Sequence, residues 1–184
     1  MSKPTSWARY HLKVSQANNI IHPSLNIFAT RFMLAKNFPD FQFRDFSRST
    51  SDAYQIALRV SLSYTALESL EGAIGCPNQI SITSSTLVTV FRSDLFKGFF
   101  NAILLAKEVE KREKENIKRI LSGENDDLRP IVYAIRNLMF HGTLTANALT
   151  LTSSVRRRQA LDELSTSVLD CVDQRFTLYV SKMK

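Results

Sequence analysis

Cysteine, glycine and proline are all scarce in this chain of 184 residues, which has two, five and five of them. The two cysteines, Cys76 and Cys171, lie far apart and form no CxxC pair. The three histidines, His11, His22 and His141, are equally scattered. This spacing excludes a disulfide scaffold and gives no zinc-ligand or cluster motif. We therefore expect no metal site and no cofactor.

Long hydrophobic runs are absent as well, because nowhere do about 18 apolar residues follow one another. The first residues include Lys3, Arg9 and Lys13 but no unbroken apolar segment of the kind found in secretory signals. We therefore expect a cytoplasmic protein that does not enter a membrane. Hydrophobic residues make up 44% of the chain and charged residues 22%, as in ordinary globular proteins. Without repeats or linkers, this length predicts one domain over residues 1–184.

The charge of the chain is unbalanced towards basic residues. Lysine and arginine number 24 and acidic residues 17, which gives a formal net charge of +7. The excess lies in residues 1–50 and 129–184, whereas residues 51–128 are slightly acidic. A basic balance favours an anionic partner such as nucleic acid.

Apolar residues recur at every third and fourth position along most of the chain, and strand patterns are nearly absent. The sequence therefore predicts an all-α fold. Ser51 or Asp52 is the expected N-cap of the clearest helix, which stops at Gly75. Ser153 or Ser154 is the expected N-cap of the last helix. The expected helices cover residues 25–37, 51–74, 87–121, 130–141 and 154–180.

Three other segments have weaker patterns. The phenylalanines of residues 38–46 either plug one end of a helical bundle or stack on bases. The mixed-charge run that starts at Lys107 predicts a solvated helix extension with pairs such as Glu110–Lys114. In the threonine-rich loop of residues 143–152, Leu149 and Leu151 alternate with threonines, as in a brief extended piece.

The expected helix at 130–141 has two different faces. Pro130 suits its first turn and Gly142 its C-terminal cap. On a helical wheel, Ile131, Ile135, Leu138 and Met139 share one side, which must face the core. The opposite side combines aromatic rings with hydrogen-bonding groups, a composition typical of a buried contact with a partner. Its members are Tyr133, Arg136, Asn137, Phe140 and His141.

The spacing Arg136-Asn137-Leu-Met-Phe-His141-Gly142 resembles the R-x4-6-H motif of HEPN domains (higher eukaryotes and prokaryotes nucleotide-binding). The run Ala-Leu-Glu-Ser-Leu at residues 66–70 is similar to an earlier core helix of that family. The resemblance covers about residues 50–182, as a helical bundle. Residues 1–50 form an N-terminal extension that the family pattern does not explain.

The resemblance implies an antiparallel bundle of four to five helices that forms a homodimer. Two R-x4-6-H motifs then meet across a two-fold axis as a metal-independent endoribonuclease site, and RNA is the partner. The wheel agrees with this expectation, because the motif face cannot be the face that packs against the chain's own core. The family also implies a toxin or defence effector with a cognate antitoxin protein. The alternatives are a non-catalytic HEPN-like module that binds RNA or protein, and a plain helical interaction protein.

The residue types indicate what each position of the motif would do. His141 can act as acid or base near neutral pH, and Arg136 offers a permanently charged fork to phosphate oxygens. Asn137, one turn before His141, can hydrogen-bond its ring or the phosphate. Glu68 would line the site. In the alternative without a functional site, His141 only caps the helix and Arg136 pairs with an acid such as Glu68.

Arginines 156–158 follow the motif loop directly. Arg156, Arg157 and Arg158 either grip flanking phosphates or belong to a solvated first turn. The triplet opposes the helix dipole, which favours a cause other than the local stability of the helix.

Overall fold

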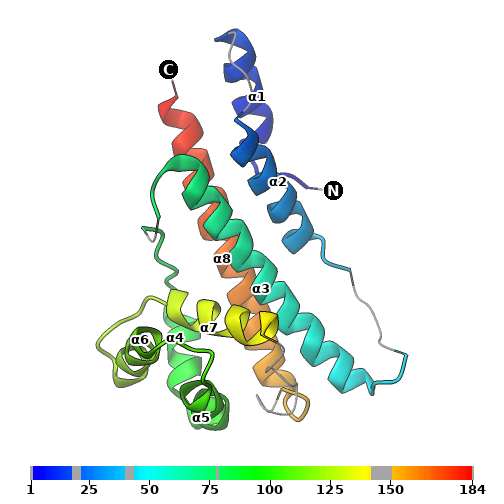
Figure 1. The fold of residues 1–184 in the computed structure, drawn as a ribbon, viewed down its shortest axis with the longest axis vertical. Helices are drawn as coiled ribbons and strands as arrows, with labels where there is room; N and C mark the ends of the chain where they lie inside the picture. The colour runs from blue at the N-terminus through cyan, green and yellow to red at the C-terminus, as the bar shows by residue number, and fades with distance from the viewer. Residues whose placement is uncertain (1, 18–21, 40–43, 78, 142–150, 184) are drawn as a thin grey trace.

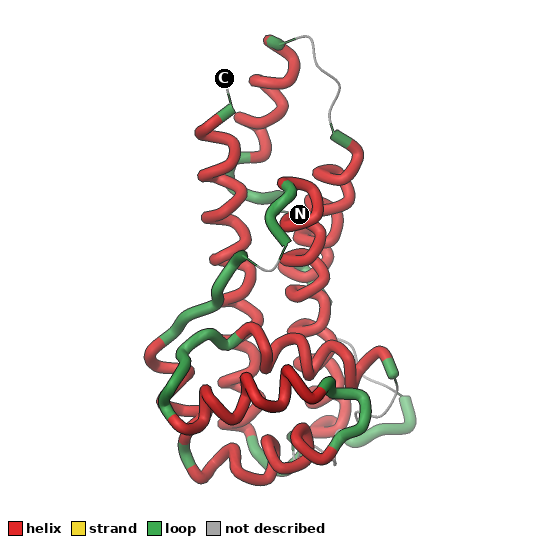
Figure 2. The backbone as a smooth tube through the Cα atoms, turned by 60° about the vertical axis from the view of Figure 1, so that its left-hand side comes forward, coloured by secondary structure: helices red, strands yellow, loops and turns green. Residues whose placement is uncertain are grey.

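The computed structural model describes residues 2–17, 22–39, 44–77, 79–141 and 151–183 (Figure 1). Along these residues the chain is helical and contains no strand (Figure 2). Thr83 and Asp127 form an isolated antiparallel bridge. The all-α prediction is therefore confirmed. The helices are α1 (Trp7–Gln16), α2 (Pro23–Lys36), α3 (Arg48–Ile74), α4 (Ser85–Arg92), η1 (Asp94–Phe96), α5 (Lys97–Leu105), α6 (Lys111–Ser122), α7 (Arg129–Phe140) and α8 (Val155–Lys182).

The two long helices α3 and α8 lie side by side in the centre of the molecule (Figure 1). They run in the same direction (Figure 1). Arg59 of α3 pairs with Asp162 of α8, and its carbonyl accepts a hydrogen bond from Ser165. The expectation of an antiparallel bundle is therefore wrong for this pair. The cause is the return segment after α3, which brings the chain back so that α4 to α7 pack together before α8 begins.

The first fifty residues contribute to the same core as the rest of the chain. No helix was expected before residue 25, yet Trp7, Tyr10 and Val14 of α1 are buried at every third or fourth position. Rings of α1 and α2 meet Phe176 of α8, with ring centroids 5.8 Å from Trp7 and 5.2 Å from Phe28. The predicted helix at 25–37 corresponds to α2.

The start of α3 differs from the expected one. Ser47 is the N-cap, and its Oγ accepts a hydrogen bond from the backbone N–H of Thr50 at 3.2 Å. Ser51 and Asp52, the two expected candidates for the cap, instead lie inside the helix, and Ser51 is buried. The C-terminal end is as predicted, because Gly75 adopts a left-handed φ of 70°.

The region expected as one helix at 87–121 is four separate elements. Extended backbone at Ser93 and Ala106 interrupts it, and Glu110 is the N-cap of α6. The breaks let buried side chains of both α5 and α6 reach one core, which a straight helix would prevent. The mixed-charge run is not fully solvated either, because Glu113 is only 7% exposed.

The last helix begins as predicted. The Oγ of Ser154 accepts a hydrogen bond from the backbone N–H of Arg157 at 3.3 Å. Gly142 and Leu149 lie outside the described residues, as do Phe41 and Phe43. Within the described ranges, no helix combines the length and the apolar character that crossing a bilayer requires.

Candidate functional site

Helix α7, which carries the motif, is anchored at its first turn by a buried ion pair. Two guanidinium nitrogens of Arg129 contact the two carboxylate oxygens of Glu71 on α3, each at 2.6 Å. Arg129 also donates to the carbonyl of Ile80, and Glu71 accepts from the backbone N–H groups of Gln79 and Ile80. Both side chains are nearly buried, with exposures of 11% and 3%. The pair therefore joins α3, the segment at 79–80 and the start of α7.

A second contact fixes the same end of α7. The Oδ1 of Asp127 accepts hydrogen bonds from the backbone N–H groups of Ile82 and Arg129 at 2.9 and 3.0 Å. Pro130 occupies the first turn as predicted, where its missing N–H costs nothing. The direction of the motif helix is thus set by contacts near its N-terminus.

The helical wheel predicts correctly, for most residues of α7, whether the side chain is buried or exposed. Ile131, Ile135 and Leu138 are buried, and Met139 is partly buried against the core. On the other side, Tyr133 and Arg136 are partly exposed, Phe140 is 63% exposed and His141 is exposed.

Asn137 is the exception on the outer face. Its side chain is buried, with an exposure of only 6%. The expectation that it lies on the exposed face is wrong, because α7 contacts both α3 and α6 and its covered surface is wider than one stripe. The buried Asn137 therefore orients the side chain of Arg136, from which it accepts a hydrogen bond.

Arg136 is held by three groups of the chain. One terminal nitrogen donates to Oδ1 of Asn137 at 2.9 Å, and the other lies 3.6 Å from a carboxylate oxygen of Glu68 on α3. The guanidinium carbon lies 5.0 Å from the ring centre of Phe140. The predicted Glu68–Arg136 pair is thus present. The Nε atom is buried and has no hydrogen-bond partner among the described residues.

His141 is the C-cap of α7 and directly follows Phe140. Its backbone N–H donates to the carbonyl of Asn137 at 3.0 Å, so its position is fixed by the last turn. The imidazole is exposed. An exposed imidazole therefore lies five residues, about 1.4 helical turns, after a partly covered guanidinium.

The three arginines that open α8 differ from one another. Arg157 donates through Nε to the carbonyl of Leu95 at 2.6 Å, and Arg158 donates to the carbonyl of Leu151 at 2.7 Å. These two side chains tie the start of α8 to neighbouring backbone. Arg156 is exposed, so it is the member of the triplet that a phosphate can reach most directly.

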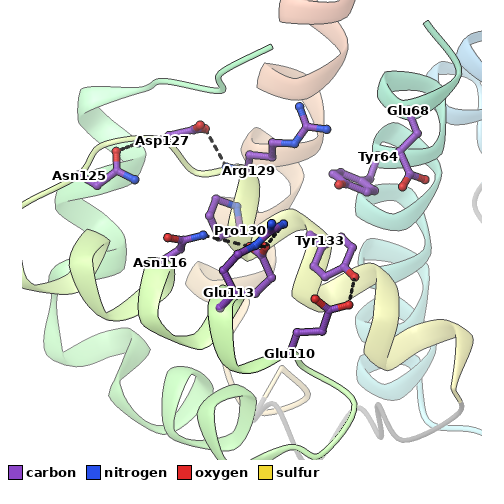
Figure 3. Close-up of a pocket in the computed structure, with 11 residues that line it drawn as sticks. Tyr64, Glu68, Glu110, Glu113, Asn116, Asn125, Asp127, Arg129, Pro130 and Tyr133 are labelled. Atoms are coloured by element: carbon purple, nitrogen blue, oxygen red, sulfur yellow. Dashed lines mark hydrogen bonds and ion pairs between the residues drawn. The ribbon is translucent and has the colours of Figure 1, made fainter. Parts of the chain in front are cut away.

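A polar pocket of about 400 Å³ lies beside the motif, between α3, α6 and α7 (Figure 3). Tyr133 of the motif face lines it, and its hydroxyl donates to Glu110 at 3.1 Å. Glu68 lines the pocket as well and also faces Arg136, so the pocket and the motif share a wall. The lining residues are Tyr64, Glu68, Glu110, Arg112, Glu113, Asn116, Asn125, Asp127, Arg129, Pro130 and Tyr133.

Tyr64 forms the inner wall of this pocket. Its ring meets that of Tyr133 edge to face at 5.8 Å, and the guanidinium of Arg129 lies 5.7 Å from its centre. Burial raises the pKa of Tyr64 to about 12, although the nearby charge of Arg129 acts against it. Although burial lowers the pKa of Arg129, the hydrogen bond with Glu71 raises it above its ordinary value. The inner wall therefore consists of the uncharged phenol of Tyr64 and the guanidinium of Arg129, whose charge is balanced by Glu71.

Sequence reasoning missed this pocket and the ion pair beside it. Glu71 and Arg129 are 58 residues apart, and no local pattern connects them. The sequence signal is weak, because Glu71 follows a second acid, Glu68, within the same expected helix.

The described residues contain no group of three or more histidine, cysteine or acidic side chains that could hold a metal ion. Comparison with protein-family models, with curated proteins and with solved structures finds no match to this chain. The resemblance to HEPN domains therefore depends only on the sequence of the motif and of residues 66–70.

Proposed function

We propose that this chain is a metal-independent endoribonuclease of the HEPN type that acts as a homodimer. The observation that carries the proposal is the geometry around Arg136. Its guanidinium is oriented by Asn137 and Glu68, while the exposed His141 follows at the end of the same helix. An oriented positive fork and an exposed imidazole on one helix are the two kinds of group that phosphodiester chemistry in RNA needs.

The reaction follows from the chemistry of RNA itself. The 2′-OH attacks the adjacent phosphorus, the bond to the 5′-oxygen breaks, and a 2′,3′-cyclic phosphate remains on one product. One imidazole removes the proton of the 2′-OH and a second protonates the departing 5′-oxygen. Arg136 stabilises the additional negative charge on the phosphate oxygens.

Two imidazoles require two chains, because each chain supplies one motif. In a two-fold dimer each motif face contacts its own copy, which doubles both Arg136 and His141 in one cleft. Phe140 supports this arrangement, since it is 63% exposed beside the motif and offers apolar surface for a contact. The family resemblance extends the proposal to a toxin or defence effector that a cognate antitoxin protein controls.

The test is cleavage of a labelled single-stranded RNA of mixed sequence by the purified full-length chain in EDTA. We expect cleavage with cyclic phosphate ends, and a rate lower by about 10²–10⁴-fold in His141→Ala and in Arg136→Ala. The matched controls His22→Ala and Arg9→Ala change exposed residues of the N-terminal helices and should keep the rate. Loss of cleavage in EDTA, or full activity of His141→Ala, would contradict the proposal.

A non-catalytic RNA-binding module is the second candidate. The Glu68–Arg136 pair favours it, because a nearby carboxylate reduces the charge that Arg136 can offer to a phosphate. In that case the chain would bind RNA with an affinity that rises as salt falls, and no variant or buffer would produce cleavage.

A further inference from the structure

The pocket beside the motif has a lining that is rich in hydrogen-bond acceptors. Four of its residues are acids, although the chain as a whole carries a charge of +7. Of its two arginines, Arg129 is bound at both terminal nitrogens by Glu71, so it has little left to offer a ligand. Phosphate is therefore a poor occupant, because carboxylates would repel it. A suitable ligand is one that presents N–H donors.

The buried carboxylate of Glu113 indicates an occupant independently of that charge balance. Its side chain is only 10% exposed, yet its ion-pair partner Arg112 is 77% exposed. Two nitrogens of Arg112 donate to Oε1 of Glu113 at 3.2 and 3.1 Å, so among the described residues Oε2 has only the Asn116 amide, at 3.5 Å. The ion pair itself contributes little, because its partner is exposed. A buried carboxylate with such weak compensation is stabilised when a ligand donates hydrogen bonds to it.

The composition of the lining favours a flat ligand. Tyr133 and Pro130 of α7 line the pocket, and so does Arg112, which binds Glu113 through Nε and one terminal nitrogen. Planar guanidinium groups and aromatic rings are the surfaces on which single-stranded bases stack. A volume of about 400 Å³ lies within the range of about 300–1,000 Å³ that is typical of small-molecule pockets.

Guanine is the base that combines these properties. Its Watson–Crick edge presents two adjacent donors, N1–H and the N2 amino group, which one carboxylate can accept together. Adenine and cytosine place an acceptor beside their amino group, so a carboxylate would face a lone pair. Glu110 is suited to this contact, because it is exposed and the Tyr133 hydroxyl at 3.1 Å orients it.

We propose that the pocket binds a guanine base, and that in RNA this base flanks the phosphate held by Arg136. The second part rests on the proposed function, whereas the first does not. The spacing suits neighbouring nucleotides, because Tyr133 beside the pocket and Arg136 at the phosphate are separated along the helix by about 4.5 Å. Glu68 borders both places, so a base in the pocket and a phosphate at Arg136 can belong to adjoining nucleotides.

The first experiment measures binding of free nucleosides to the full-length chain by amide chemical-shift titration. We expect guanosine to bind at least about tenfold more tightly than inosine, which lacks the N2 amino group, because that group donates to a charged acceptor. Glu110→Gln should lose this preference. Glu115→Gln is the matched control, since this exposed glutamate of α6 pairs with Lys118 and does not line the pocket.

A second experiment maps the cleavage sites on the mixed-sequence RNA. Sites beside guanine in the wild type, and a loss of that preference in Glu110→Gln, would agree with the pocket proposal. Cleavage without base preference, together with no guanosine binding, would overturn the pocket and leave the nuclease standing. Guanosine binding without any cleavage would overturn the nuclease and leave the pocket. Tighter binding of spermidine than of guanosine would overturn the pocket, because the lining would then select positive charge.

Discussion

Glu71 and Arg129 form a two-point ion pair, with both nitrogen–oxygen distances at 2.6 Å, inside a protein interior. The pair joins the C-terminal part of α3 to the first turn of α7, and it is the structural support of the motif helix.

Removal of one partner of this pair should destabilise the fold strongly. We expect Glu71→Ala to lower the free energy of unfolding by about 3–5 kcal/mol, because it leaves a buried guanidinium without a counter-charge. Urea denaturation measures this. Asp94→Ala, which breaks the exposed pair with Lys97, is the control and should leave the urea midpoint unchanged. Equal losses in the two variants would contradict the structural role of Glu71.

The stability of the protein should fall in strongly alkaline solution, partly through Tyr64. Its pKa rises from 10.0 to about 12 on folding, so between these values the native state binds more protons than the unfolded state. The contribution is complete below pH 10 and is lost as pH rises towards 12, up to about 3 kcal/mol. Urea midpoints of Tyr64→Phe should decline less steeply across this window than those of the wild type. Parallel declines would contradict the burial of the phenol.

Phe140 should control dimer formation. Because it is 63% exposed in one chain, Phe140→Asp should fold normally but lose the dimer and the activity together. Light scattering after size-exclusion chromatography measures the mass. Leu12→Asp alters another exposed apolar side chain, on α1, and should remain dimeric. A wild type that is monomeric at all concentrations would remove the basis of this prediction and of the shared cleft.

Helix α1 should contribute to global stability, since it belongs to the main core. Trp7 is only 6% exposed and packs on Phe176, so Trp7→Ala should cost about 3–5 kcal/mol in unfolding free energy. The neighbouring exposed Arg9→Ala should cost almost nothing. If both variants unfold at the same urea concentration, α1 is not part of the cooperative unit.

The arginine triplet should separate into two kinds of residue. Arg156→Ala should weaken RNA binding, because this exposed side chain can contact a phosphate. The slope of log affinity against log salt concentration should become shallower by about 1, the value for one lost phosphate contact. Arg157→Ala should instead lower thermal stability, because its guanidinium holds the carbonyl of Leu95. Fluorescence anisotropy over a salt series and thermal denaturation distinguish the two effects.

The helices that were predicted well are those whose ends have a local chemical cause. Gly75 supplies the left-handed residue that stops α3, and Ser154 supplies the side-chain cap of α8. Local chemistry also misled, because Lys and Glu at 107–116 favour helix and gave no sign of the break before α6. The break arises from packing, which acts between residues far apart in sequence.

In the candidate site, too, features with a local cause were predictable from the sequence and features set by packing were not. The sequence offered the Glu68–Arg136 pair as the alternative to a functional site, and the structure contains it. Burial of Asn137 depends on how many helices surround α7, and a single helical wheel has no information about that number. The pocket collects residues from three helices and two connecting segments, so no sequence window contains it.

The parallel arrangement of α3 and α8 has a consequence during synthesis on the ribosome. Arg59 and Ser165 are neighbours in space but are separated by 106 positions. At about 5–20 residues per second, the surface of α3 that receives α8 waits roughly 5–20 s for its partner. The nascent chain therefore exposes an apolar face until α8 leaves the exit tunnel, and this interval is when a chaperone has the most apolar surface to bind.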